Sequence, residues 1–111
     1  MEINEYQRRA MTTRNSALHQ QEILLNSVMG LCGESGEVID LVKKHLFQGY
    51  PLDKTQLAEE LGDVAWYLAE AADALEIPLE DIFQKNLQKL QQRYPQGFEE
   101  SRSLDRSGEP R

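Results

Sequence analysis

The apolar residues of this chain recur at intervals of three and four, which is the spacing of one face of an α-helix. Two long stretches carry the pattern clearly. In the first, about residues 18–47, one helical phase contains Leu24, Val28, Leu31, Ser35, Val38 and Val42. In the second, the phase contains Leu57, Leu61, Val64, Leu68, Ala72 and Leu75. No stretch reads convincingly as a strand, so the sequence predicts an all-α fold.

Capping and helix-breaking residues set the ends of four predicted helices. Asn4 and Gln7 have the spacing of a capping box at the start of a short helix, about residues 5–12. Gly49, followed by a proline, ends the second helix, and Asp53 is the predicted N-cap of the third. The fourth helix starts with acidic residues at 80 and 81, which suit the helix dipole, and runs to about Tyr94.

The last segment, residues 99–111, consists mostly of serine, glycine, proline and charged residues. It has too little apolar surface to order itself, so we expect a disordered tail, or one ordered only against a neighbour. The folded domain is therefore predicted to span residues 1–98. A chain of 111 residues has little core of its own, which favours association into an oligomer.

Composition narrows the class of protein further. No run approaches the roughly 18 apolar residues of a membrane span, and the acidic N-terminus does not resemble a secretory signal. Cys32 is the only cysteine, which excludes an intramolecular disulfide and a zinc site with several thiolates. We therefore expect a cytoplasmic protein that neither crosses nor binds a membrane.

The net charge of −7 bears on the ligand. It argues against a nucleic-acid partner, because phosphate backbones need a clustered basic surface. A small polyphosphate remains compatible if a divalent cation lies between the two sets of negative charges. The sequence has neither a βαβ alternation nor a glycine-rich phosphate loop, which excludes a Rossmann or P-loop nucleotide site.

A short internal repeat places four carboxylates at matching positions of the two long helices. Glu34-Ser35-Gly36-Glu37-Val38 recurs as Glu60-Leu61-Gly62-Asp63-Val64. At about 100° per residue, both acid pairs fall on the same edge of their apolar stripes. Both pairs also lie at about the same distance from the connecting turn. Antiparallel packing of the two helices is therefore expected to bring all four carboxylates together.

Such a cluster is repulsive unless its members are protonated or share a cation, and its oxygen ligands suit Mg²⁺. Gly36 and Gly62 each cost about 1 kcal/mol relative to alanine inside a helix, so we expect them to allow close backbone approach. The alternative is that each acid pair is part of an ordinary solvated surface. Trp66 is predicted to point away from the apolar stripe, towards a subunit interface or a capped surface position.

These motifs resemble the MazG-like all-α nucleoside triphosphate pyrophosphohydrolases. The resemblance rests on the Glu-x-x-Glu and Glu-x-x-Asp pairs and covers about residues 3–98. It extends to residues 4–7, 59–68, 85–90 and 93–95. It implies a four-helix MazG-like bundle that is completed by homo-oligomerisation, as a tetramer or a dimer.

The resemblance implies hydrolysis between the α and β phosphates, which releases a nucleoside monophosphate and pyrophosphate. The metal ligands of the family correspond to Glu34, Glu37, Glu60 and Asp63. The implied metal is Mg²⁺, with Mn²⁺ as a substitute. Glu34 or Glu37 is the candidate general base, and the residues do not choose between them.

Five further residues are predicted to contact substrate. By family analogy, Tyr67 stacks on the base or contacts the sugar. Asn86, Lys89 and Arg93 share one face of the fourth helix, which suits phosphate binding, although ordinary surface charge is the alternative for the two basic residues. Lys43 is a weaker candidate for the distal phosphates.

The resemblance to short single-domain members favours deoxynucleotides and a role in nucleotide-pool cleansing. A non-catalytic, metal-binding regulatory oligomer is the main alternative. The same scaffold could also act on another phosphate anhydride such as phosphoribosyl-ATP. A di-iron carboxylate bundle is disfavoured, because the chain lacks paired Glu-x-x-His motifs.

Overall fold

The computed structural model describes residues 1–104, and every secondary-structure element assigned in this range is an α-helix. They are α1 (Ile3–Met11), α2 (Gln20–Phe47), α3 (Lys54–Ala74), α4 (Leu79–Arg93) and α5 (Glu100–Leu104). The predicted all-α class is confirmed. The chain divides into two compact units, Met1–Leu79 and the residues from Glu80 onward.

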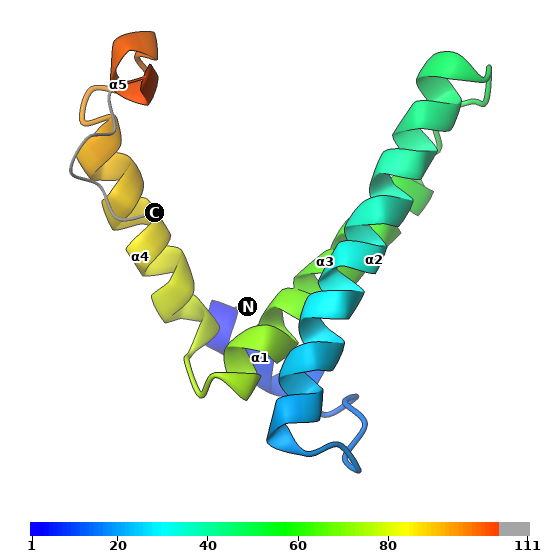
Figure 1. Cartoon of the computed structure of the whole chain (residues 1–111), viewed down its shortest axis with the longest axis vertical. Helices are drawn as coiled ribbons and strands as arrows, with labels where there is room; N and C mark the ends of the chain where they lie inside the picture. The colour runs from blue at the N-terminus through cyan, green and yellow to red at the C-terminus, as the bar shows by residue number, and fades with distance from the viewer. Residues whose placement is uncertain (105–111) are drawn as a thin grey trace. The chain divides into compact units, whose positions relative to one another are not determined.

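In the first unit, α2 and α3 run side by side in opposite directions, and α1 packs against α3 (Figure 1). The buried apolar residues gather where these three helices meet. They are Ile23, Ala69, Ala72, Ala74 and Leu79. Three of the five are alanines, and their small side chains let α1 and α2 approach α3 closely. Of the positions predicted to form the buried face of α3, Ala72 is buried, but Leu61 and Leu75 are each about half exposed, at 53% and 52%.

The buried face of α2 is displaced by one residue from the predicted stripe. Ile23 and Ser27 are buried, whereas Val28 is 42% exposed. One residue corresponds to about 100° of rotation, so Glu34 moves from the edge of the stripe into the α2–α3 interface, where it is half-buried. The apolar pattern misleads here because the interface uses small and polar positions of α2.

Gly30 explains why that interface tolerates a large aromatic side chain. The Tyr67 ring lies against the Gly30 backbone, so that a Cβ added at Gly30 would be only 2.1 Å from a ring carbon. A Cβ added at Gly36 or Gly62 would have nothing within 4 Å among the described residues. The expected close approach at Gly36 and Gly62 is therefore wrong, because the contact falls at Gly30 instead.

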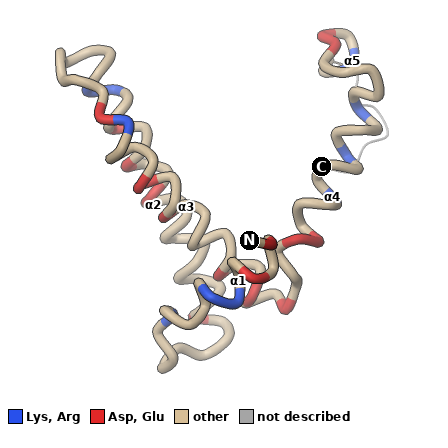
Figure 2. The backbone as a smooth tube through the Cα atoms, turned by 180° about the vertical axis from the view of Figure 1, so that it is seen from behind, with Lys and Arg blue, Asp and Glu red and all other residues tan. Residues whose placement is uncertain are grey.

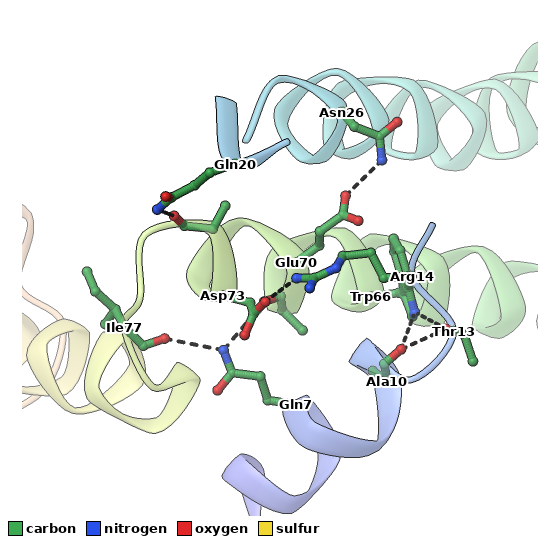
Figure 3. A network of polar contacts seen from close by, with 12 residues as sticks. Gln7, Ala10, Thr13, Arg14, Gln20, Asn26, Trp66, Glu70, Asp73 and Ile77 are labelled. Atoms are coloured by element: carbon green, nitrogen blue, oxygen red, sulfur yellow. Dashed lines mark hydrogen bonds and ion pairs between the residues drawn. The ribbon is translucent and has the colours of Figure 1, made fainter. Parts of the chain in front are cut away.

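A hydrogen bond between an exposed residue of α2 and a buried acid of α3 lies one turn from this contact. Glu70 is fully buried, and its Oε1 accepts a hydrogen bond of 2.8 Å from Asn26 Nδ2 (Figure 3). A buried polar group without a partner is costly, so sliding α2 along α3 would cost this bond. The Asn26–Glu70 and Gly30–Tyr67 contacts together fix the register of the two helices.

Gln7 anchors α1 and does not take part in an N-terminal capping box. It is buried; its Nε2 donates to the carbonyl oxygen of Ile77 at 3.2 Å, and its Oε1 accepts from the Leu79 N–H at 2.8 Å. The structure places Glu2 at the N-cap of α1. The predicted Asn4–Gln7 capping box is therefore wrong, because the glutamine side chain is needed between α1 and the α3–α4 connection.

Trp66 is covered by α1. Its Nε1 donates to Thr13 Oγ1 at 2.9 Å and to the Ala10 carbonyl at 3.2 Å (Figure 3). Arg14, just beyond α1, pairs with Asp73 of α3. The outward orientation that suggested a subunit interface at Trp66 is thus explained within the chain, because the chain turns back and lays α1 over this side of α3.

The helix ends follow local capping chemistry. The predicted N-cap at Asp53 is confirmed, since its Oδ1 accepts from the N–H groups of Thr55 and Gln56 at 3.1 Å each. Gly49 adopts a φ of 76° after α2, a conformation that suits glycine. The start of α2 lies two residues later than predicted, where the His19 N–H donates to Glu22 Oε1 at 2.9 Å.

The second unit contains α4 and α5. Glu80 and Asp81 occupy the first turn of α4, and the Tyr94 and Phe98 rings lie 5.3 Å apart between the two helices. Within the segment predicted to be a disordered tail, the structure assigns α5 to Glu100–Leu104, which has no buried residue. Residues 105–111 of that segment lie outside the described residues. No helix in the described part of the chain is long and apolar enough to cross a membrane.

Replacing Gly30 with alanine is expected to lower the free energy of unfolding by about 1–3 kcal/mol, because the new methyl group collides with the Tyr67 ring. The matched control is Gly36→Ala on the same helix. It meets no described atom and gains helix propensity, so it should stabilise by up to about 1 kcal/mol. Urea unfolding of both variants tests this, and equal effects would contradict the Gly30–Tyr67 contact.

Candidate metal centre and adjoining cavity

The register of α2 and α3 places acids opposite acids. One to two turns along the pair from the Gly30–Tyr67 contact, Glu34 and Glu37 of α2 face Glu60 of α3. One carboxylate oxygen from each of these three residues lies within 4.8 Å of the other two. Figure 2 shows the acidic positions of both helices along their shared length. The structure therefore brings together three of the four predicted metal ligands.

The cluster is strained electrostatically. The pKa of Glu37 is raised, first by its hydrogen-bonding interaction with the Glu60 carboxyl and then by the charge of Glu60. The pKa of Glu60 is raised chiefly by its hydrogen-bonding interaction with Glu34. The interaction with Glu37 lowers it in part, whereas burial and the charges of Glu34 and Asp63 raise it further. These carboxyl groups therefore retain protons at a higher pH than isolated ones would.

Two oxygens in the cluster lack hydrogen-bond partners. Glu34 Oε2 and Glu60 Oε2 are buried and accept no hydrogen bond from any described residue. Buried carboxylate oxygens are stabilised by a donor or by a cation, and the three side chains offer oxygen ligands only. A hard divalent cation such as Mg²⁺ fits this donor set, and the remaining ligands would be waters or phosphate oxygens.

Asp63 lies beside this group and is not one of the three. Its carboxylate raises the pKa of Glu37 and Glu60, so it is within electrostatic reach of both. Asp63 also lines a cavity of about 370 Å³ together with Glu34. Asp63 therefore connects the carboxylate cluster to the cavity.

The rest of that cavity is aromatic and polar. Besides Glu34 and Asp63, its lining consists of Thr13, Trp66 and Tyr67. The two aromatic rings are nearly perpendicular, at 85°, with centroids 5.1 Å apart. The volume falls in the range of small-molecule sites. An acid cluster and an aromatic cavity thus share an edge within the first unit.

The remaining predicted substrate contacts lie elsewhere. Lys43 is exposed and forms an ion pair of 3.6 Å with Asp40, one turn earlier on α2. Asn86, Lys89 and Arg93 lie on α4, whose residues from Glu80 onward belong to the second unit. None of these four residues belongs to the carboxylate cluster or to the lining of the cavity.

Thr13 and Trp66 are the cavity residues that the sequence did not suggest as part of a site. Trp66 is expected from the sequence at a subunit interface or a capped surface position, and Thr13 is not singled out. Thr13 lies just past the end of α1, in a polar segment that reads only as a helix break. No local pattern indicates that this segment folds back to Trp66. The aromatic pair of Trp66 and Tyr67, three and four residues after Asp63, is the one signal that could have suggested a cavity here.

Comparison with known proteins agrees with this geometry. The MazG nucleotide pyrophosphohydrolase domain matches residues 22–98, which include all four predicted ligands. This match covers more than half of the chain, and the chain belongs to the MazG family.

A phage protein is among its relatives. Gene 37 protein of Mycobacterium phage L5 is 42% identical over 73 residues, which cover 62% of this chain and 64% of that protein. The chain thus spans slightly less than two thirds of the relative's length. No solved structure matches the chain significantly.

The raised pKa values predict how stability depends on pH without metal. Folded Glu37 and Glu60 hold protons above their ordinary pKa of 4.5, so the folded state loses stability as the pH rises through their titration. We therefore compare the melting temperatures of Glu60→Gln and wild type in EDTA. The difference between them, variant minus wild type, should become more positive by a few degrees between pH 5 and pH 8.

Glu59→Gln is the matched control, because it removes the same charge from an exposed position of α3. Differential scanning fluorimetry across this pH range measures both variants. Added Mg²⁺ should remove the wild-type loss of stability at pH 8. If Glu60→Gln and Glu59→Gln change the melting temperature by the same amount at every pH, the proposed repulsion is contradicted.

Proposed function

We propose that this chain is an Mg²⁺-dependent nucleoside triphosphate pyrophosphohydrolase that converts (d)NTP to (d)NMP and pyrophosphate. The convergence of Glu34, Glu37 and Glu60 carries the proposal, because three carboxylate oxygens within 4.8 Å of one another form a donor set that suits a divalent cation. The family supplies the class of reaction, nucleotide pyrophosphohydrolysis. The neighbouring cavity offers aromatic rings beside the acids, as a nucleotide would require.

The acids divide into two roles. Glu34, Glu37, Glu60 and Asp63 would hold the metal, and Mn²⁺ would substitute for Mg²⁺. The bound ion would supply positive charge that neutralises and orients the triphosphate. Glu34 or Glu37 would accept the proton of the attacking water. The water oxygen forms the new bond to phosphorus, the α–β anhydride bond breaks, and pyrophosphate leaves.

The other predicted residues would bind the substrate. Tyr67 would stack on the base, a role that its position in the cavity supports. Lys43 would reach the distal phosphates by leaving Asp40, and the ion pair is exposed enough for such an exchange. Asn86, Lys89 and Arg93 share one face of α4 by their spacing and would contact phosphate oxygens.

We further propose that the chain acts as a homo-oligomer, a tetramer or a dimer. Large apolar residues of α2 are exposed in the single chain, including Leu25 at 58%, Met29 at 64% and Ile39 at 65%. A second copy would bury such a face, which soluble monomers rarely expose. Light scattering tests this, and a monomer at micromolar concentration would refute it.

The proposed setting is the cytoplasm, with a role in nucleotide-pool cleansing and a preference for deoxynucleotides. The acidic charge of the chain disfavours nucleic acid as a partner.

Pyrophosphate release from the eight common nucleotides, with Mg²⁺ and with EDTA, tests the proposed activity. Turnover should require the metal, and Glu60→Gln should lower kcat at least about 100-fold, because it removes one of three convergent carboxylates. The exposed Glu59→Gln variant should keep wild-type turnover. Metal-dependent folding without turnover of any triphosphate would instead favour a non-catalytic regulatory oligomer. If phosphoribosyl-ATP is turned over and none of the eight nucleotides is, phosphoribosyl-ATP is favoured as the substrate.

A further inference from the structure

The hydroxyl group of Thr13 has a fixed hydrogen-bond direction. The Trp66 Nε1–H can only donate, so Thr13 Oγ1 accepts at 2.9 Å. The same oxygen lies 2.7 Å from the carbonyl oxygen of Ala10. Two oxygens at this distance need a proton between them, and the carbonyl has none to give. The Thr13 hydroxyl proton therefore points at Ala10.

The consequence is a cavity lined almost entirely by hydrogen-bond acceptors. Thr13 Oγ1 has used its proton and one lone pair, so it offers a ligand one remaining acceptor site. The indole N–H of Trp66 is already engaged. Glu34 and Asp63 accept hydrogen bonds when ionised, which leaves the Tyr67 hydroxyl as the one lining side chain free to donate.

The acceptor at Thr13 is also held rigidly. Trp66 is itself fixed by packing edge-on against Tyr67. On the other side, Arg14 pairs with Asp73 directly after Thr13 in sequence, and Gln7 fixes α1 to the α3–α4 connection (Figure 3). A preorganised acceptor discriminates between ligands better than a mobile one, because it cannot turn to donate.

We propose that this cavity selects nucleobases that carry an exocyclic amino group, which donates to Thr13 Oγ1 while the base lies against the aromatic side chains. The proposal rests on the proposed function, which brings a nucleotide to the acids at the cavity edge. An oxo group at the same position would set two acceptors against each other, and the site would reject it.

A sugar hydroxyl is another donor that could meet Thr13. The base is favoured because Trp66 and Tyr67 offer aromatic surface, which a planar ring covers better than a sugar does. Matched substrates separate the two sources. The pairs dCTP and dUTP, and dATP and dITP, replace the amino group with an oxo group and turn the neighbouring ring nitrogen from an acceptor into an N–H donor, whereas dideoxy-CTP lacks only the 3′-hydroxyl of dCTP.

The experiment measures kcat/KM for these nucleotides and, separately, the binding of dCMP and dUMP by fluorescence of Trp66, the single tryptophan. Wild type should prefer the amino member of each pair by about tenfold, mainly through KM. Thr13→Val keeps the shape but removes the acceptor, so the ratio should fall towards one. Thr13→Ser keeps the hydroxyl and should keep the preference.

Melting temperatures of the two variants check that both fold. If Thr13→Val does not fold, Thr13→Ser provides the test, because this variant must retain the preference for the amino member. A wild-type ratio near one, or a preference that Thr13→Val leaves unchanged, overturns the proposal. A third outcome is that wild type has a lower kcat/KM for dideoxy-CTP than for dCTP and that Thr13→Val does not. This outcome would mean that Thr13 binds the sugar, and it would overturn the proposed contact with the base. Absence of turnover together with tighter dCMP binding refutes the proposed function but not the amino selection.

Discussion

Mutual repulsion between carboxylates on two facing helices is the constraint on which the rest of this structure depends. Glu34, Glu37 and Glu60 converge within 4.8 Å, and two of their oxygens are buried without partners. Such an arrangement opposes the packing of α2 on α3 unless protons or a cation compensate. The protein therefore has to hold the two helices in register by other contacts, and those contacts lie one to three turns away, towards the start of α2.

That end of the pair combines close packing with directional bonds. Gly30 admits the Tyr67 ring, Asn26 binds the buried Glu70, and alanines of α3 allow α1 to pack closely. A displacement of one residue along either helix would break the hydrogen bond and set the Tyr67 ring against a residue that carries a side chain. The same contacts orient Tyr67 at the cavity, so the region that fixes the register also shapes the surface beside the acids.

Much of this could be predicted from the sequence, because the helices and the acid repeat are local patterns. The four helices, the Asp53 cap and the pairing of acids across two helices follow from spacing alone. Three features could not be predicted in this way, because each depends on a partner distant in sequence. They are the burial of Glu34, the contact at Gly30 and the position of Trp66. Gln7 illustrates the limit: its spacing from Asn4 fits a local cap, yet the fold uses it to bind the α3–α4 connection.

The central claim is that one divalent cation is shared by carboxylates from α2 and α3. Anomalous diffraction from crystals of the full chain grown with Mn²⁺ tests it most directly, since Mn²⁺ scatters anomalously and takes the same oxygen ligands as Mg²⁺. We expect a peak bonded to oxygens of Glu34, Glu37 and Glu60. Well-ordered side chains with the manganese bound elsewhere, or with the three acids turned apart into solvent, would contradict it.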